Sequence, residues 1–159
     1  MSSDPSPKRL SSGILVINEQ AELLLCHVTG HGHWDLPKGG MNEDETPRQA
    51  ARRETHEETG LVIDDAGLID LGRFTYRAKK DLHLFAVLMP RFEVAQLHCD
   101  SHFSQWATGR QLPEMDDFQW VEFERVSQLT TPKMAAVLAG RISLPGVLDT
   151  LRQRQPALV

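Results

Sequence analysis

The sequence predicts a single α/β domain in which helices cover a mixed β-sheet. Three observations support this fold class. Runs rich in β-branched and aliphatic residues at 12–18, 21–28 and 82–89 are typical of strands. Helical segments with capping signals begin near residues 46 and 131, so helices alternate with strands along the chain. The 159 residues contain no internal repeat and no linker, which indicates one core.

The N-terminal part of the chain is expected to supply a tail and a strand pair. Residues 1–10 contain no apolar segment and are interpreted as a disordered tail, which leaves 11–159 as the single domain. The runs 12–18 and 21–28 flank a short polar joint and are expected to form a hairpin or an adjacent strand pair. Residues 34–40 contain a strand end that proline and glycine break.

One helix has recognisable signals at both ends. Thr46 is expected to be its N-cap, with Pro47 at the first helical position and Gln49 completing a capping box. Gly60 is expected to end the helix, because glycine readily adopts the left-handed conformation found just past a helix C-terminus.

The C-terminal half is predicted to return to strands and to finish with helices. Strands are expected at 61–77, 82–89 and 118–126, with residues 79–81 forming the turn between the first two. The stretch 91–117 has no clear period and receives no assignment. Two final helices are expected, at 131–140 and 144–154.

Composition restricts the classes of partner. The net charge of −5 argues against a duplex-binding surface, which needs a basic footprint, but it permits a small phosphorylated ligand. Cys26 and Cys99 form no disulfide framework and are expected to be free thiols in a reducing compartment. The apolar run 84–89 is far shorter than a membrane span. We expect a soluble, cytoplasmic protein that does not contact a membrane.

Three glutamates crowd one face of the capped helix. Glu54, Glu57 and Glu58 lie three and four residues apart, where like charges weaken a helix by a few tenths of a kcal/mol per pair. A hard divalent cation prefers such a set of convergent carboxylates. Arg53 is four residues before Glu57 and is expected to pair with it. By this spacing alone, a solvated acidic face is the alternative.

The residues around these glutamates resemble the signature of the Nudix hydrolases, G-x5-E-x7-R-E-U-x-E-E-x-G-U, in which U is a bulky aliphatic residue. Eight of its nine specified positions agree, namely Gly39, Glu45, Arg53, Glu54, Glu57, Glu58, Gly60 and Leu61. The exception is Thr55, whose hydroxyl is expected to bond the carbonyl of Ala51 one turn earlier.

The resemblance implies a Nudix-type α/β/α sandwich and hydrolysis of a nucleoside diphosphate linked to another group, with Mg²⁺ or Mn²⁺ as cofactor. Glu57 and Glu58 are then the principal metal ligands, and Glu54 is a further ligand or the base. Gly39 is expected to let the loop turn and to offer its carbonyl to the metal. Glu45 is expected to brace the loop against the helix.

Two further patterns resemble the Nudix branch that cleaves dinucleoside polyphosphates. One is Trp34-x-x-Pro37-Lys38-Gly39, directly before the signature. The other places an acidic residue, Glu114, six positions before a tryptophan, with the aromatic Phe118 between them. Glu114 is therefore a candidate metal ligand or general base. A solvated turn before a strand explains the same acidic run equally well.

Several side chains are candidates for substrate binding. Lys38, Lys79 and Lys80 could bind a polyphosphate, and between Leu71 and Arg91 five Lys or Arg accompany one acidic residue. An edge strand kept basic against aggregation is the alternative. Tyr76 and Phe118 could stack on a base, although aromatic residues are more often core. His31 and His33 lie on a nearby loop and are interpreted as incidental.

These features predict a metal-dependent pyrophosphohydrolase whose partner is a small-molecule nucleotide, foremost a dinucleoside polyphosphate such as diadenosine tetraphosphate. The alternatives are an enzyme acting on the 5′ end of RNA, the one nucleic-acid partner considered, or on nucleoside triphosphates or nucleotide sugars. A non-catalytic nucleotide-binding module is disfavoured because the signature glutamates and arginine are all present. The oligomeric state is not predicted.

Overall fold

A mixed β-sheet lies at the centre of the structure, a computed structural model that describes residues 8–154. Its strands are β1 (Arg9–Ile17), β2 (Glu22–Val28), β3 (Trp34–Asp35), β4 (Lys38–Gly40), β5 (Ile69–Arg77), β6 (Lys80–Leu88) and β9 (Met115–Glu122). The main order is β3-β2-β1-β6-β5, with β4 beside β1 and β9 beside β2. The pair β1 and β6 is parallel and the other pairs are antiparallel, so the predicted mixed sheet is confirmed.

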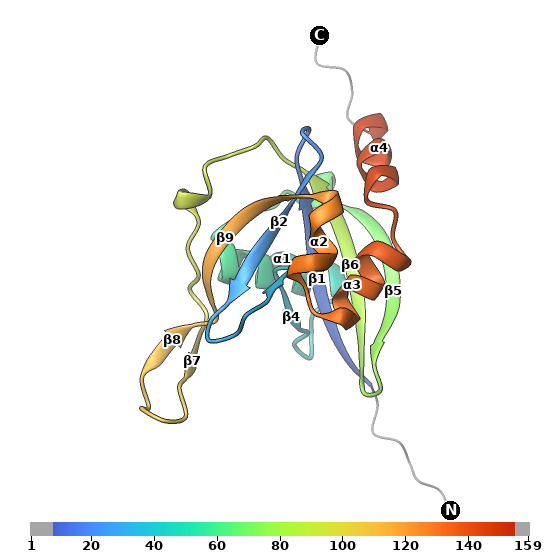
Figure 1. Cartoon of the computed structure of the whole chain (residues 1–159). Coiled ribbons are helices and arrows are strands. Elements are labelled where there is room, and N and C mark those ends of the chain that lie inside the picture. The colour runs from blue at the N-terminus through green and yellow to red at the C-terminus, as the bar shows by residue number, and fades with distance from the viewer. Residues whose placement is uncertain (1–7, 155–159) are drawn as a thin grey trace, which may run out of the picture.

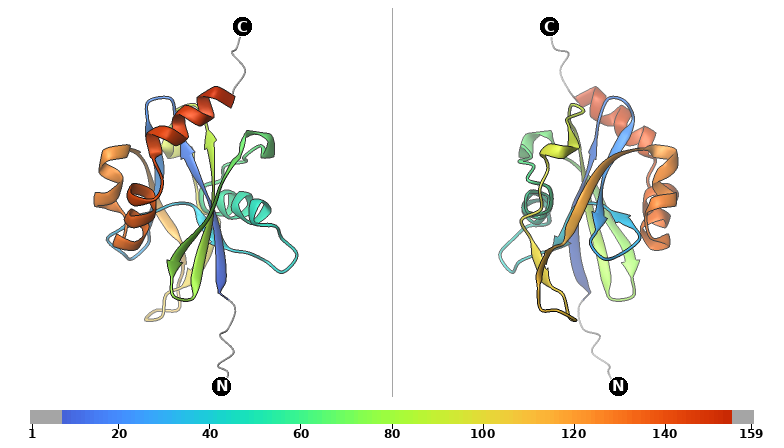
Figure 2. Two further views of the ribbon diagram at one scale, coloured as in Figure 1. Left: turned by 90° about the vertical axis from the view of Figure 1, so that its right-hand side faces the viewer. Right: turned by 60° about the vertical axis from the view of Figure 1, so that its left-hand side comes forward.

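Helices cover both faces of this sheet (Figures 1 and 2). Helix α1 (Pro47–Thr59) lies on one face, and α2 (Val126–Leu129), α3 (Pro132–Gly140) and α4 (Leu144–Arg154) lie on the other. Strand β1 is buried on both sides: Ile14 packs in the cluster beneath α1, and Leu15 packs in the cluster beneath α3 and α4. A strand covered on both faces reads as a continuous apolar run. The α/β/α sandwich is therefore confirmed.

The caps of α1 are those that the sequence predicts. Thr46 Oγ1 accepts the Gln49 amide at 3.1 Å, and Gln49 Oε1 accepts the Thr46 amide at 2.9 Å. Gly60 ends the helix with a φ of 83°, in the left-handed region. These caps fix where the helix begins and ends, and thus which residues face the loop before it.

The sheet is split beside β1. Strand β1 pairs with β4 over Ser11 to Gly13 but with β2 at Ile17. A Cβ on Gly13 would lie 2.7 Å from both Lys38 Cβ and the Pro37 carbonyl oxygen, so only glycine permits this close approach. The split lets the chain segment leading into β4 reach α1, where the Lys38 amide donates to Glu58 Oε1 at 3.3 Å.

Several expected boundaries need correction. Of the strand expected at 61–77, only 69–77 is β5, because Asp64 caps a 3₁₀ turn, η1 (Asp65–Gly67), and accepts the Ala66 amide at 3.2 Å. The strand expected at 118–126 begins at Met115 and ends at Glu122. It is followed by η3 (Phe123–Arg125) and α2, which were not expected.

Other boundaries differ at the chain start and in the unassigned stretch. Of the tail expected at residues 1–10, residues 1–7 lie outside the described part of the chain. Arg9 and Leu10 are not part of a tail, because they begin β1. Lys80 and Asp81, expected in a turn, belong to β6. The stretch 91–117 contains η2 (Val94–Gln96) and a small hairpin of β7 (His102–Ser104) and β8 (Gln111–Pro113).

Within residues 8–154, no single helix has the length and apolar character needed to cross a membrane. The pair α3 and α4, bent by 54° at its break, meets that test by length and composition when taken together.

Candidate active site

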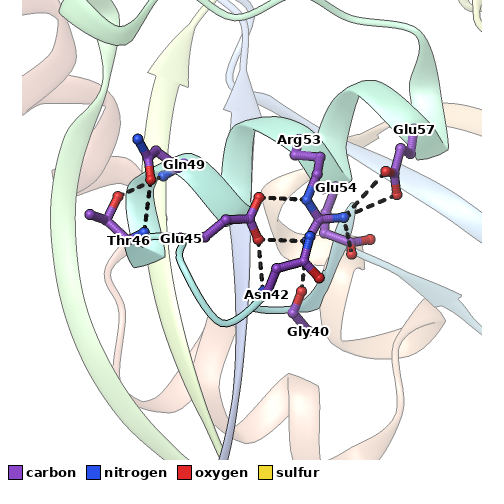
Figure 3. Close-up of polar contacts among 8 residues, drawn as sticks. All are labelled: Gly40, Asn42, Glu45, Thr46, Gln49, Arg53, Glu54 and Glu57. Carbon is purple, nitrogen blue, oxygen red and sulfur yellow. Dashed lines mark hydrogen bonds and ion pairs between the residues drawn. The ribbon is translucent and has the colours of Figure 1, made fainter.

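Arg53 holds the loop before α1 against the helix (Figure 3). Its Nε and Nη2 donate to the two oxygens of Glu45 at 2.6 and 2.9 Å, and Nη2 also donates to the Gly40 carbonyl at 2.8 Å. Nη1 donates to Glu54 at 2.9 Å and to Glu57 at 3.2 Å. The expected pairing of Arg53 with Glu57 is thus present, and Glu45 braces the loop through the same guanidinium.

Gly39 is required because Glu54 lies directly against it. A Cβ at Gly39 would fall 2.2 Å from the Glu54 carboxyl carbon, so any side chain there would displace the carboxylate. The expected role of Gly39 in a tight turn is corrected: its φ is not positive, and it pairs with Ser12 as part of β4. Close packing, and not backbone turning, explains this glycine.

Glu58 and Glu114 meet at one pocket of about 350 Å³, although they lie far apart in the sequence. Glu58 is 1% exposed and projects from α1, whereas Glu114 directly precedes β9. The pocket brings together three residues that the sequence singles out, Lys38, Glu58 and Glu114. The other residues that line it are Val28, Thr29, His31, His33, Asp35, Phe103 and Met115.

Carboxyl groups crowd around this pocket and raise one another's pKa. Burial, followed by the charges of Glu54 and Glu114, raises the pKa of Glu58 to about 9, against a partial opposing effect from the Lys38 amide. Burial also raises the pKa of Glu54, in spite of its hydrogen bond from Arg53. Conversely, the Arg53 hydrogen bond lowers the pKa of Glu45. The charge of Glu45 is therefore compensated by its partner, whereas the folded protein disfavours the charged forms of Glu54 and Glu58.

Lys38 is a fixed cation at the other side of the pocket. Its side chain is 15% exposed, and its Nζ lies 3.2 Å from Asp35 Oδ2 and 5.9 Å from the centre of the Tyr76 ring. Burial alone would lower the pKa of Lys38, but the charge and hydrogen bond of Asp35, together with the charges of Tyr76 and Glu58, outweigh burial, and the net shift is upward. The ammonium therefore stays charged, and Lys38 lines the same pocket as Glu58 and Glu114.

The structure does not bring the remaining candidates to the pocket. Tyr76 is 8% exposed and belongs to the core beneath α3 and α4. Phe118 is half-buried against the core beneath α1. Lys79 is exposed in the turn before β6, and the pKa of Lys80 is lowered by burial and then by the positive charges of Lys38 and Arg77. Lys80 thus lies close enough to Lys38 for the charge of Lys38 to lower its pKa.

The donor set fits a hard divalent cation by its chemistry. Glu54, Glu57 and Glu58 supply the carboxylate oxygens that Mg²⁺ and Mn²⁺ prefer, and a cation beside Glu58 would favour the ionised form that burial disfavours. Within residues 8–154, however, no three His, Cys, Asp or Glu side chains are arranged to hold an ion together. In this arrangement Arg53 Nη1 donates to Glu54 Oε1 and to Glu57.

Sequence reasoning missed several pocket residues. Phe103 lies in the stretch that received no assignment, and His31 and His33, taken as incidental, line the pocket. Asp35 was not singled out, although its position three residues before Lys38 was a usable signal.

The expected bond of Thr55 is also corrected. Among the described residues its buried hydroxyl has no hydrogen-bond partner. The bond one turn apart is made instead by Thr59, whose hydroxyl donates to the Thr55 carbonyl at 2.6 Å.

Comparison with known proteins gives sequence relatives over most of the chain. The sequence profile of the NUDIX domain matches residues 7–140. An uncharacterized 17.7 kDa protein of Enterobacteria phage T4 is 34% identical over 142 residues, covering 82% of this chain and 93% of that protein. An RNA pyrophosphohydrolase of Vibrio atlanticus is 29% identical over 123 residues, covering 72% of this chain and 71% of the relative.

Solved structures share the fold at lower identity. A Caenorhabditis elegans (C. elegans) Ap4A hydrolase has a TM-score of 0.58 and 21% identity, covering 88% of this chain and 98% of its own. The NUDIX domain of Shewanella oneidensis NrtR, solved with ADP ribose, has a TM-score of 0.60 and 20% identity, covering 88% and 92%. The chain therefore belongs to the NUDIX domain family and is a hydrolase of phosphoanhydride bonds, as its loop and helix signature implied.

Proposed function

We propose that this protein is a Mg²⁺- or Mn²⁺-dependent pyrophosphohydrolase that cleaves dinucleoside polyphosphates. One observation carries the proposal: the buried Glu58, the remote Glu114 and the ammonium of Lys38 line the same pocket. Carboxylates that hold a cation and a lysine that binds phosphate are the two components that cleavage of a polyphosphate needs.

Each residue has a distinct part in the proposed reaction. When bound, the cation polarises the phosphorus and lowers the pKa of a water molecule. Glu57 and Glu58 would hold it, with Glu54 and the Gly39 carbonyl as further ligands. Arg53 keeps the carboxylates of Glu54 and Glu57 next to each other.

Two further residues act from outside the helix. Glu114 lies at the pocket and is exposed, so it can take a proton from water at the pocket mouth. Lys38 binds the negative oxygens of the polyphosphate, because its charge is retained and its position is fixed by Asp35.

Dinucleoside polyphosphates are favoured as substrates by two sequence patterns, Trp34 to Gly39 and Glu114 to Trp120. The structure adds that both patterns border the pocket, since Lys38 and Glu114 each line it. A specific observation also favours a second candidate, the 5′ end of RNA: relatives at 29–30% identity are named RNA pyrophosphohydrolase. Either substrate is a nucleotide that carries a chain of phosphates.

The test compares substrates and variants in one assay. The purified chain is incubated with Mg²⁺ and diadenosine tetraphosphate, ATP, ADP-ribose or a 5′-triphosphorylated RNA oligomer, and products are resolved chromatographically. Glu57→Gln should lower turnover by at least about a hundredfold, because loss of a ligand misplaces the cation and the water. The matched control is Glu43→Gln, which removes an exposed carboxylate of the loop before α1 and should leave turnover near that of the parent.

Diadenosine tetraphosphate should have the highest kcat/KM of the four. If the RNA oligomer is the best substrate, the second candidate replaces the first. Full activity of a folded Glu57→Gln variant, or of the parent in excess chelator, would contradict the metal-dependent mechanism itself.

A further inference from the structure

The base of the β7–β8 hairpin is hydrogen-bonded to helix α1, which carries the candidate metal ligands. At its base, the amides of Asp100 and Ser101 donate to the Glu57 carbonyl at 2.6 and 3.3 Å. The Glu114 amide closes the hairpin by donating to the Ser101 carbonyl at 2.9 Å. The hairpin extends away from the sandwich (Figures 1 and 2), so an element that begins at the active site reaches out into solvent.

The tip of the hairpin is ordered by its own hydrogen bonds. The Gln105 amide donates to the Arg110 carbonyl at 2.8 Å, and the Gly109 amide donates back to the Gln105 carbonyl at 2.7 Å. Thr108 Oγ1 adds a bond to Gln105 Oε1 at 2.7 Å, and Gly109 supplies the positive φ that the turn needs. A side chain on this tip is therefore presented on a defined turn.

This hairpin carries two exposed aromatic side chains. Phe103 is 37% exposed and lines the pocket beside Glu58 and Glu114. Trp106 is 98% exposed, three residues further along the hairpin. Three residues span at most about 10 Å of extended chain, so the backbone of Trp106 lies within about 10 Å of that of Phe103, a residue that lines the pocket. An indole that is almost fully exposed is a surface on which a planar ligand can stack.

The charge of the hairpin suits a phosphorylated ligand. Residues 101–113 contain Arg110 and no Asp or Glu, in a chain whose net charge is −5. A sugar–phosphate backbone passing along this segment would meet no like charge. Arg110 would also attract it.

We infer that the β7–β8 hairpin binds the nucleobases of the substrate, with Phe103 stacking on the base next to the pocket and Trp106 stacking on a second base beyond it. This inference rests on the proposed function and extends it, because it selects substrates that contain two nucleobases. In a dinucleoside polyphosphate the second base belongs to the far nucleoside, and in RNA it belongs to the following nucleotide. Both present the same planar group to the indole.

The experiment separates stacking from other effects of the indole. kcat/KM is measured for diadenosine tetraphosphate, a 5′-triphosphorylated dinucleotide and ATP with the parent, Trp106→Ala, Trp106→Phe and Phe103→Ala. Trp106→Ala should lower kcat/KM for a two-base substrate, relative to ATP, by about thirtyfold, the middle of the range for loss of one stacked base. Trp106→Phe should restore most of this ratio. Phe103→Ala should lower kcat/KM for all three substrates.

A fluorescence titration tests binding without turnover. In Glu57→Gln, a two-base substrate should quench tryptophan emission, and Trp106→Phe in that background should remove the quench. Of diadenosine tetraphosphate and the 5′-triphosphorylated dinucleotide, the one whose kcat/KM falls more in Trp106→Ala identifies the source of the second base. Either result supports the inference. An equal loss for ATP, an unchanged ratio, or a phenylalanine variant as impaired as alanine would overturn it.

Two controls separate base stacking by Trp106 from other effects of an exposed apolar side chain. Val62→Ala removes another exposed apolar side chain and should not alter the ratio. Loss of self-association in Trp106→Ala, seen by size-exclusion chromatography, with an unchanged substrate ratio would show a protein contact and overturn the inference. Absence of hydrolysis with every substrate would contradict the proposed function alone, because quenching by a nucleotide would still report stacking.

Discussion

Arg53 organises the acidic residues through a single guanidinium. It donates to Glu45, Glu54, Glu57 and the Gly40 carbonyl, and the ammonium of a lysine, with three N–H donors on one nitrogen, could not serve all four partners. The i to i+4 pairing with Glu57 could be predicted from helical spacing. The bond to Gly40 could not, because it depends on how the loop folds back over the helix.

We expect Arg53→Lys to lower the free energy of unfolding by about 1–3 kcal/mol, since several charge-assisted hydrogen bonds are lost. kcat should fall by at least about tenfold, because Glu54 and Glu57 lose their shared partner. Chemical denaturation and steady-state kinetics measure the two effects. Arg52→Lys is the matched control, because Arg52 Nε makes one bond, to the Ile63 carbonyl, away from the site. Equal effects of both variants would contradict the central role of Arg53.

Gly39 and Gly40 are adjacent but face different surroundings. A Cβ at Gly39 would collide with the Glu54 carboxylate, whereas a Cβ at Gly40 has no heavy atom within 4 Å. Gly39→Ala should therefore lower kcat by at least about tenfold through displacement of Glu54, and Gly40→Ala should have a much smaller effect. Parallel kinetic assays of the two variants test this, and comparable losses would show that close packing is not the constraint.

At the scale of elements, α1 is the part of the chain whose local signals agree with one another. Its N-cap, first-turn proline, capping box and C-terminal glycine all act within a few residues, so the sequence alone defines its limits. The segments 61–68 and 91–117 lack such signals. The backbone of these segments is held by isolated hydrogen bonds, such as the one that the Ala66 amide donates to Asp64. Hydrophobic periodicity does not predict such bonds.

Thr46→Ala should lower the free energy of unfolding by about 1 kcal/mol, because the Gln49 amide loses its acceptor. For a domain of this size, that loss corresponds to a fall in Tm of about 2–4 °C. Thr46→Ser keeps the oxygen and should behave like the parent. Differential scanning calorimetry of the three proteins decides the matter; a serine variant as unstable as alanine would point to lost packing of the methyl group.

At the scale of the whole molecule, protonation at the site is linked to global stability. The pKa of Glu58 is raised to about 9 from its usual 4.5. Below pH 4.5 the carboxyl is protonated in both the folded and unfolded states, and its environment costs nothing. As the pH rises from 4.5 toward 9, the carboxyl ionises in the unfolded state but stays protonated in the folded state, so the unfolded state is favoured and stability is lost.

We therefore expect the metal-free protein to lose stability between about pH 5 and 9, and Mg²⁺ to raise Tm more at pH 8 than at pH 5. Glu58→Gln removes the group that ionises only in the unfolded state, so it should raise the Tm of the metal-free protein at pH 8 while reducing the effect of Mg²⁺. Thermal melts at both pH values, with and without Mg²⁺, measure this. A Glu58→Gln variant less stable than the parent at pH 8 would show that its environment favours the charged form.

The sequence by itself determined the family, the limits of α1 and the pairing of its charges, because these depend on contacts within a few residues of one another. Only the tertiary structure decided which candidates share a pocket. Glu114 meets Glu58 because β9 adds beside β2 and the loop before it returns to α1. Lys38 reaches them because Gly13 lets β4 split the sheet. Tyr76 lies in the core because of the register of β5. Strand register sets the face to which each side chain points, and it depends on residues far apart in the chain.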